Sequence, residues 1–284
     1  MRLLAAAVVT CWPLLGASPT QLEQARKLYR YTDYDASLKI LQAIQPKDGE
    51  VYLLIGKNQY MRGDYKKATD TFAKAVATDP DNSDYEMWLA QAYGRRAETS
   101  SPFMALGNAS KARQHFERSV QLNPRNKDAL SSLFEYYLEA PGFLGGGMEK
   151  AVRVANQIAV IDPVEGHWAL ARLAEKKKQY DTAQAQFQRA AELAPGQVGR
   201  LIDLARFLAR HGRYQESDQS FQEAAKIAPN SPKVLYARAD TYIQQGRHLD
   251  AARRLLKRYL QAQLSPDDPP REAAEKLLRK ASGG

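Results

Sequence analysis

The sequence predicts an all-α protein built as a solenoid of stacked antiparallel helix pairs. One observation is a series of prolines that close similar stretches of chain, namely Pro80, Pro124, Pro163, Pro195 and Pro229. The intervals between them are 44, 39, 32 and 34 residues. A second observation is that one order of small, aromatic and bulky side chains precedes these prolines. A period of ~34 residues is typical of a helix–turn–helix repeat, and the longer intervals fit the same unit with an insertion.

Two units show this order most clearly. The first contains Gly56, Gly63, Tyr65, Ala68, Phe72, Ala75 and Pro80. The second has Ala205, Gly212, Tyr214, Ser217, Phe221, Ala224 and Pro229 at the corresponding positions. Small residues allow two helices to approach closely, bulky residues fill the space to the next pair, and the turn glycines accept positive φ. Two further copies keep this register, with Ala171, Tyr180, Ala183, Phe187, Ala190 and Pro195, and with Ala239, Gly246, Ala251 and Leu255.

The residue order at these positions resembles the tetratricopeptide repeat family, over about residues 19–263. The resemblance implies a right-handed superhelical solenoid of about seven repeats, in which the first helix of each pair lines the concave face. The first unit is degenerate, as expected of a terminal repeat. Residues 265–270 contain helix breakers, and the residues after them predict a short polar helix that caps the stack. We therefore expect a solenoid over 18–263 and a capping helix and tail over 264–284.

The third and fourth units are longer than the pattern requires. The extra residues lie near 97–108 and near 140–147, and we expect two loops that leave the solenoid at the same edge. Each loop contains apolar residues that a solvated loop does not need. These residues either fold back over their own unit or form a contact patch for a partner: Phe103, Met104, Phe143 and Leu144.

The first residues have the pattern of a secretory signal peptide. Arg2 is followed by an apolar stretch over 3–15 and then by Gly16, Ala17 and Ser18. This order predicts a signal peptide over 1–17 and an exported, periplasmic or secreted protein, although a buried first helix has a similar composition. The one cysteine of the chain, Cys11, lies inside this stretch, so cleavage would leave no thiol for disulfides or catalysis. No apolar run beyond this stretch approaches the ~20 residues of a membrane span.

The sequence offers no pattern of catalytic or metal-ligating residues. The four histidines, His115, His167, His211 and His248, fall in four different units, and none has a carboxylate or histidine three or four residues later. There is no Gly-x-Ser-x-Gly motif. We therefore expect a protein that is not an enzyme and has neither a metal site nor a cofactor.

Basic and aromatic residues dominate the positions that the resemblance places on the concave face. They are Arg26, Tyr29, Arg30, Lys57, Tyr60, Gln91, Arg95, Trp168, Arg172, Lys176, Arg206, Arg210 and Tyr236. Three glutamates also fall at inward positions: Glu135, Glu139 and Glu175. The chain carries 41 basic and 32 acidic residues, a formal charge of +9, which either serves solubility alone or favours an acidic ligand in the groove.

These patterns favour a scaffold outside the cytoplasm that binds a partner protein or an acidic peptide segment in a concave groove. Arginine suits an acidic ligand because its guanidinium pairs bidentately with a carboxylate. Nucleic acid is disfavoured by export and by inward residues that vary too much between repeats for a base code. The insertions are similar to those of exported bacterial repeat proteins, some of them linked to solute transport. The alternative function is therefore a periplasmic solute-binding or transporter-associated protein that holds a small ligand between repeats.

Overall fold

The computed structural model describes residues 19–283, which form fifteen α-helices and one 3-10 helix, with no strand in that range. Seven consecutive helix pairs are followed by one final helix. Their bounds are α1 Pro19–Arg30, α2 Tyr34–Ala43, α3 Gly49–Met61, α4 Tyr65–Thr78, α5 Ser83–Thr99, α6 Pro102–Leu122, α7 Lys127–Glu139, η1 Gly142–Leu144, α8 Met148–Ile161, α9 Pro163–Lys176, α10 Tyr180–Leu193, α11 Val198–Arg210, α12 Tyr214–Ile227, α13 Pro232–Gln244, α14 Leu249–Gln261 and α15 Arg271–Ala281. The all-α solenoid predicted from the repeat is confirmed. The expected signal peptide over 1–17 lies outside the described residues.

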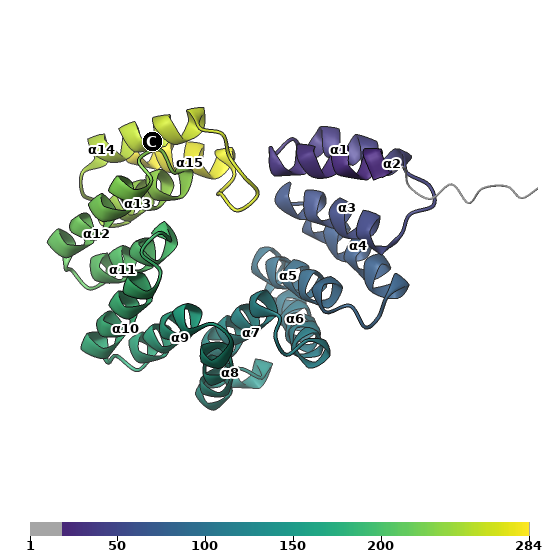
Figure 1. The fold of residues 1–284 in the computed structure, drawn as a ribbon, viewed down its shortest axis with the longest axis horizontal. Coiled ribbons are helices and arrows are strands. Elements are labelled where there is room, and N and C mark those ends of the chain that lie inside the picture. The colour runs from purple at the N-terminus through teal and green to yellow at the C-terminus, as the bar shows by residue number, and fades with distance from the viewer. Residues whose placement is uncertain (1–18, 284) are drawn as a thin grey trace, which may run out of the picture.

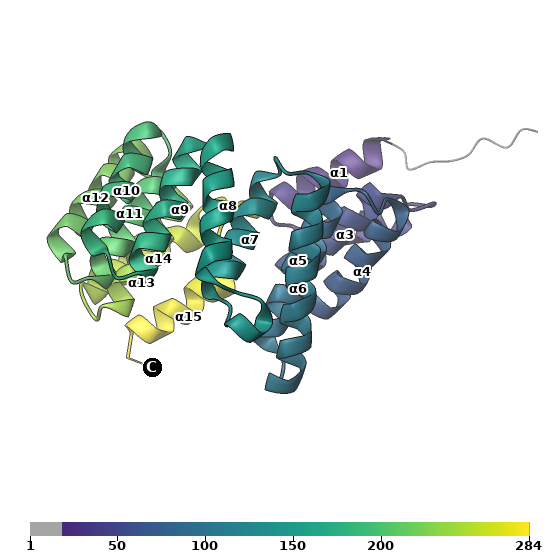
Figure 2. The ribbon, with the colours of Figure 1, turned by 90° about the horizontal axis from the view of Figure 1, so that it is seen from below.

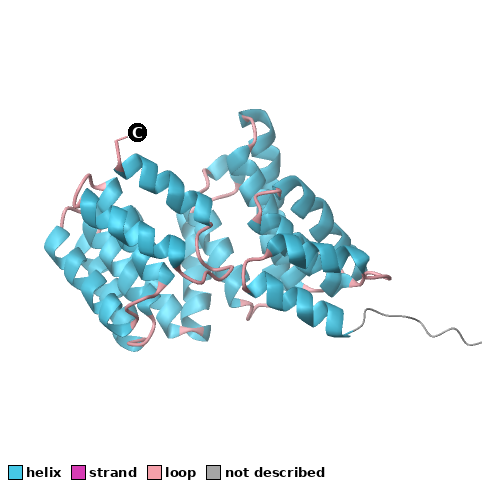
Figure 3. Ribbon diagram, turned by 90° about the horizontal axis from the view of Figure 1, so that it is seen from above, coloured by secondary structure: helices cyan, strands magenta, loops and turns pink. Residues whose placement is uncertain are grey.

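The helix pairs curve into an open ring (Figure 1). The first helices of the pairs, α1 to α13 in odd numbers, line the inside, and the second helices lie outside. Each helix packs mainly on its pair partner and on the next pair, and α15 packs on α13 and α14. The ring closes far enough to bring α1 and α2 opposite the segment between α14 and α15 (Figure 1). Figure 3 shows that short loops make all the connections. None of the helices in 19–283 is both long and apolar enough to span a bilayer.

The repeated residues of the sequence form the core between helices. Phe72, Phe187 and Phe221 on the outer helices are each at most 2% exposed, and the small residues four positions earlier are equally buried. Gly56 on α3 packs so closely on the Phe72 ring that a Cβ would lie 2.4 Å from it. Such close packing is the reason that the order of small and bulky residues is repeated.

One turn geometry joins the helices of five pairs. The second residue after the inner helix has positive φ in each of them, and it is glycine in three: Gly63, Gly212 and Gly246. Thr32 and Lys178 take the same conformation with φ of 61° in the first and fifth pairs. Side chains other than glycine disfavour this conformation. The first and fifth turns are therefore strained relative to the other three.

The first insertion is helical, so the loop expected near 97–108 is wrong. Helix α5 continues to Thr99, and α6 starts at Pro102 after the N-cap residue Ser101. Proline is favoured at the first helical position, and the alanines and leucine of the insert are good helix formers. The insertion therefore lengthens α5 and α6 to 17 and 21 residues. This pair projects beyond its neighbours at the lower edge of Figure 2.

The second insertion forms η1 and a glycine turn. The Tyr136 hydroxyl donates to the Leu144 carbonyl at 2.9 Å, and Lys150 donates to the Gly145 carbonyl at 2.8 Å. At Gly146 a Cβ would lie 1.9 Å from the Ala140 carbonyl oxygen, so only glycine fits. The backbone of this insertion is thus held against its own unit, and η1 contacts α6.

Candidate binding surface

All the residues predicted to face the groove lie on the inner helices. Each of α1, α3, α5, α9, α11 and α13 carries at least one, as the residue numbers show. Two of the aromatic residues also belong to the core: Trp168 contacts Phe134 at 5.7 Å between ring centroids, and Tyr236 contacts Tyr259 at 5.2 Å. The predicted residues therefore share the inner helices, but they differ in how much of each side chain remains exposed.

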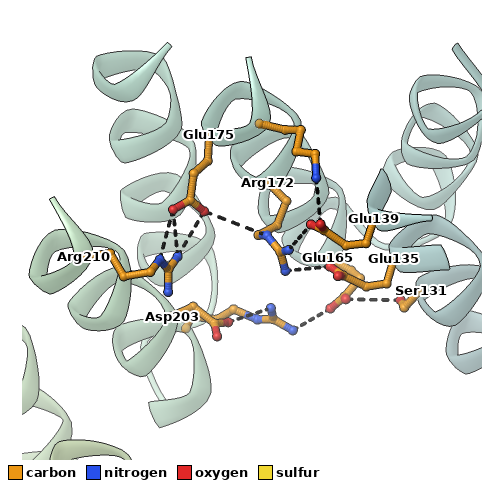
Figure 4. A network of polar contacts seen from close by, with 10 residues as sticks. Ser131, Glu135, Glu139, Glu165, Arg172, Glu175, Asp203 and Arg210 are labelled. Atoms are coloured by element: carbon orange, nitrogen blue, oxygen red, sulfur yellow. Dashed lines mark hydrogen bonds and ion pairs between the residues drawn. The ribbon is translucent and has the colours of Figure 1, made fainter. Parts of the chain in front are cut away.

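Acidic residues of α7 and α9 are the ion-pair partners of the central basic residue of the groove. Arg172 on α9 donates to Glu135 at 2.7 Å and to Glu139 at 3.1 Å, both on α7 (Figure 4). It also lies 3.9 Å from Glu175 on its own helix. Lys176 donates to the second oxygen of Glu139 at 2.7 Å. The cations predicted to attract an acidic ligand thus already have carboxylate partners.

The same pairing continues onto α11 and α13. The Arg210 guanidinium forms three hydrogen bonds with Glu175, between 2.9 and 3.1 Å (Figure 4). His211 also lies 3.2 Å from Glu175. Arg206 has a longer contact with Asp240, at 3.9 Å. Most of the positive charge of this half of the groove is therefore neutralised inside the protein.

A second row of polar contacts lies beside the first. Arg200 on α11 pairs with Glu165 on α9, and both side chains are only 18% exposed. Glu165 also accepts from Ser131 on α7 at 3.2 Å, and Arg200 contacts Asp203 at 3.2 Å. We call both rows together the ion-pair ladder: Glu135, Glu139, Glu165, Arg172, Glu175, Lys176, Arg200, Asp203 and Arg210.

Burial changes the acidity of two ladder carboxyls. It raises the pKa of Asp203 to about 6, against the opposite effect of Arg200 and Arg206. It also raises the pKa of Glu135, and Arg172 counteracts this shift. Asp203 is thus held in the charged form less firmly than an exposed aspartate.

Aromatic side chains of α3, α4 and α5 contact one another at the N-terminal end of the groove. Tyr60 contacts Tyr65 and Trp88 edge to face, with ring centroids 5.4 and 5.7 Å apart. Lys57 lies over the Trp88 ring at 4.6 Å, and Arg95 lies over Tyr65 and donates to its hydroxyl at 3.1 Å. We call these five residues the aromatic wall. Cations on aromatic faces are held by the ring quadrupole and need no carboxylate.

Two of the predicted groove cations at this end have no carboxylate partner within 19–283. Lys57 has only Trp88 beneath it, and burial lowers its pKa although Asp84 acts in the opposite sense. Arg30 on α1 is exposed and forms no ion pair in this part of the chain. Arg26 pairs with Glu50, and Arg95 pairs with Glu98 on its own helix. Gln91 donates to the Met87 sulfur at 3.3 Å.

The predicted edge residues are largely exposed. Phe103 is 91% exposed and Phe143 78% exposed, whereas Met104 is half exposed and Leu144 half buried. η1 contacts α6, and Gly145 after η1 lies against Arg113, which follows the first insertion along α6. The partial burial of Leu144 fits a segment that covers its own unit, whereas the exposure of the other three side chains fits a contact patch.

Several residues of this surface were not predicted from the sequence. The prediction counted inward positions from one small residue of each first helix. It therefore missed Trp88, Tyr65, Arg200 and Asp203. A signal was present in the spacing: the partners in the ladder are separated by one repeat, 37 residues for Arg172 and Glu135. The separation is 35 residues for Arg200 and Glu165 and for Arg210 and Glu175.

Comparisons with known proteins agree with this architecture. Family models of the tetratricopeptide repeat match residues 50–82, 168–232 and 202–269. A TPR repeat-containing protein of Dictyostelium discoideum is 26% identical over 183 residues, which are 63% of this chain and 67% of that protein.

Two crystal structures have a similar fold. A thermophilic TPR protein of Thermus thermophilus superposes with a TM-score of 0.56 and 24% identity, over 66% of this chain and 97% of that one. A tetratricopeptide repeat protein of Parabacteroides merdae gives a TM-score of 0.60 and 15% identity, over 93% and 98% of the two chains. The fold is that of protein-interaction scaffolds. These matches identify tetratricopeptide repeats at residues 50–82 and 168–269, and the described chain as a whole has the stacked helix pairs of such repeats.

Proposed function

We propose that this protein is a non-enzymatic scaffold that holds an extended segment of a partner protein along the inner helices, outside the cytoplasm. The observation that carries the proposal is the aromatic wall. It presents partly exposed rings and a lysine without a carboxylate partner in the described chain on a continuous concave surface. Aromatic side chains and arginine contribute most to many protein interfaces, because they bury a large area with few rotatable bonds.

An acidic segment is the ligand that suits the N-terminal half best. Lys57 and Arg30 have no competing carboxylate in the described chain, whereas Arg172, Lys176 and Arg210 would have to leave theirs. Replacing an existing ion pair with a new one yields little net free energy. An acidic side chain is therefore expected to approach α1 and α3 rather than α9 and α11.

The exposed edge residues provide a second contact in this proposal. Phe103, Met104 and Phe143 come from the two insertions, and they place apolar surface in solvent. Exposed apolar surface of this kind is typical of protein interaction sites. A partner that extends from the groove around this edge would bury them.

Export is part of the proposal and rests on the N-terminal sequence. Sequencing the mature N-terminus of protein recovered from the cell envelope tests it. A start near residue 18 supports export, and an intact Met1 in the native host contradicts it.

Site-specific photocrosslinking tests the binding surface. A photoreactive phenylalanine analogue at Tyr60 should crosslink to a partner segment rich in Asp and Glu, and the crosslinked peptide is sequenced by mass spectrometry. Arg30→Gln with Lys57→Gln should reduce crosslinking, and Arg172→Gln with Lys176→Gln is the matched control because it also removes two positive charges. Crosslinking only from a probe at Arg210, or an equal loss in both variants, would contradict an N-terminal binding surface.

A further inference from the structure

A hollow lies where the two ends of the solenoid approach each other. Its volume is ≈ 660 Å³, within the range of ligand sites in proteins. One side is formed by the turns of the first two pairs, over 32–35 and 61–65, and the other by residues 264–272. These are the elements that face each other across the opening of the ring in Figure 1. The hollow is separate from the aromatic wall except for Tyr65.

A buried carboxylate on the wall of this hollow is only half satisfied. Asp268 is 8% exposed, and its Oδ2 accepts from the backbone N–H of Ser265 at 2.9 Å and from the Ser265 hydroxyl at 2.8 Å. Its Oδ1 is buried and has no hydrogen-bond partner among the described residues. A buried carboxylate oxygen without a donor makes the charged form of Asp268 costly, and a cation in the hollow would reduce that cost through its field.

The hollow is acidic although the chain as a whole carries +9. Its lining contains four carboxylates, those of Asp33, Asp35, Asp268 and Glu272, and two guanidinium groups. Both guanidinium groups are already engaged. Arg62 pairs with Asp35, and Arg271 donates to the last carbonyls of α14. A net charge of −2 remains, from four negative and two positive groups.

The field of these carboxylates reaches the opposite wall. Tyr34, on the first pair, has its pKa raised to about 12, mainly by burial and then by Asp268, Asp267 and Glu272. The negative potential of the C-terminal segment therefore acts on the N-terminal side of the hollow. A cation between the two sides would interact favourably with both.

The chemistry of the lining distinguishes between kinds of cation. No group of three potential ligands suited to a metal ion occurs within 19–283. Part of the lining is apolar or aromatic, from Tyr34, Met61, Tyr65, Leu264 and the prolines 269 and 270. Such a wall suits a hydrocarbon chain, and carboxylates suit the N–H groups at its end.

We propose that this hollow is a binding site for an organic cation, an ammonium or guanidinium group on a short alkyl chain, with Asp268 and Glu272 as its acceptors. The cation is either a free amine or the basic side chain of a peptide, since both present the same group. Because the site is formed by both ends of the chain, its ligand contacts the first and the last elements of the solenoid at once.

Titration calorimetry at low ionic strength tests the proposal on the whole protein. The probes are n-butylammonium and n-butylguanidinium, with butyrate as the anion of similar size. The alkyl cations should bind and butyrate should not. Asp268→Asn and Glu272→Gln should each weaken cation binding by about tenfold, the effect of one charge-assisted hydrogen bond. Glu272 is exposed and forms no ion pair in the described chain, so Glu272→Gln should leave the fold intact. This variant therefore tests the site even if Asp268→Asn does not fold.

Glu223→Gln is the matched control, because it removes one exposed carboxylate from the outer helix α12. It should leave the affinity unchanged. Comparison of the free cations with acetyl-Gly-Arg-Gly-amide identifies the source: tighter binding of the peptide indicates a partner side chain, and weaker binding a free amine. No binding of any cation, equal binding of butyrate, or affinities unchanged in both the Asp268 and the Glu272 variants would overturn the proposal.

Discussion

The two halves of the concave surface use the same helix positions in different ways. In the N-terminal half, Lys57 and Arg95 lie on aromatic rings, and the aromatic wall keeps part of its surface for a ligand. In the C-terminal half, Arg172 and Arg210 are held by glutamates of α7 and α9. A cation at an inward position therefore indicates an anion-binding site only where no carboxylate of the neighbouring repeat pairs with it. The ladder joins adjacent repeats, whereas the wall presents surface to a partner.

The largest effect is expected from the core beneath the aromatic wall. Phe72→Ala should reduce the free energy of unfolding by about 3–5 kcal/mol, because the ring is fully buried between Gly56 and Trp88. Urea denaturation followed by circular dichroism measures this change. The exposed Phe103 is the control, and Phe103→Ala should change stability by less than about 0.5 kcal/mol. Equal effects would mean that the wall does not rest on a packed core.

The ladder should depend strongly on its most buried pair. Glu165→Gln should cost about 2 kcal/mol, since it leaves the buried Arg200 with a weaker acceptor. Adding Arg200→Gln to this variant should cost less than the sum of the single changes, because both remove the same interaction. Additive costs in a double-mutant cycle would show that the two side chains act independently.

The stability of the protein should depend on pH through Asp203 of the ladder. The folded pKa of Asp203 is about 6, above its ordinary value of 3.8. Protonated Asp203 is therefore favoured by folding, and its contribution is fully present below pH 3.8 and lost as the pH rises through 6. Relative to Asp203→Asn, the wild-type protein should lose about 1 kcal/mol of stability between about pH 4 and pH 7, after allowance for partial exposure. Unfolding curves of both proteins at several pH values measure this difference, and parallel curves would contradict the raised pKa.

The smallest effect is expected at an exposed pair outside the ladder. Arg62 and Asp35 are 42% and 80% exposed. Arg62→Gln should change the free energy of unfolding by less than about 0.5 kcal/mol, as for most solvated ion pairs. A thermal unfolding midpoint close to that of the wild type is the expected reading. A loss as large as that of Glu165→Gln would remove the distinction between buried and exposed pairs.

The helix pairs and their core could be predicted because their signals are local. The positions of Phe72, Phe187 and Phe221 relative to the small residues before them define which face of each outer helix is buried. The first insertion was predicted as a loop because its length broke the repeat pattern. Its own composition and Pro102 instead extend both helices of the pair.

The sequence by itself determined the number of repeats, the inner and outer helices and the residues between them, because each unit contacts mainly its neighbours. It also contained the spacing of the ladder, since side chains one repeat apart meet on adjacent inner helices. Only the tertiary structure decided that Tyr34 and Asp268 lie on opposite sides of one hollow. That proximity depends on the rotations between all seven pairs added together, and small differences at each junction accumulate along the superhelix.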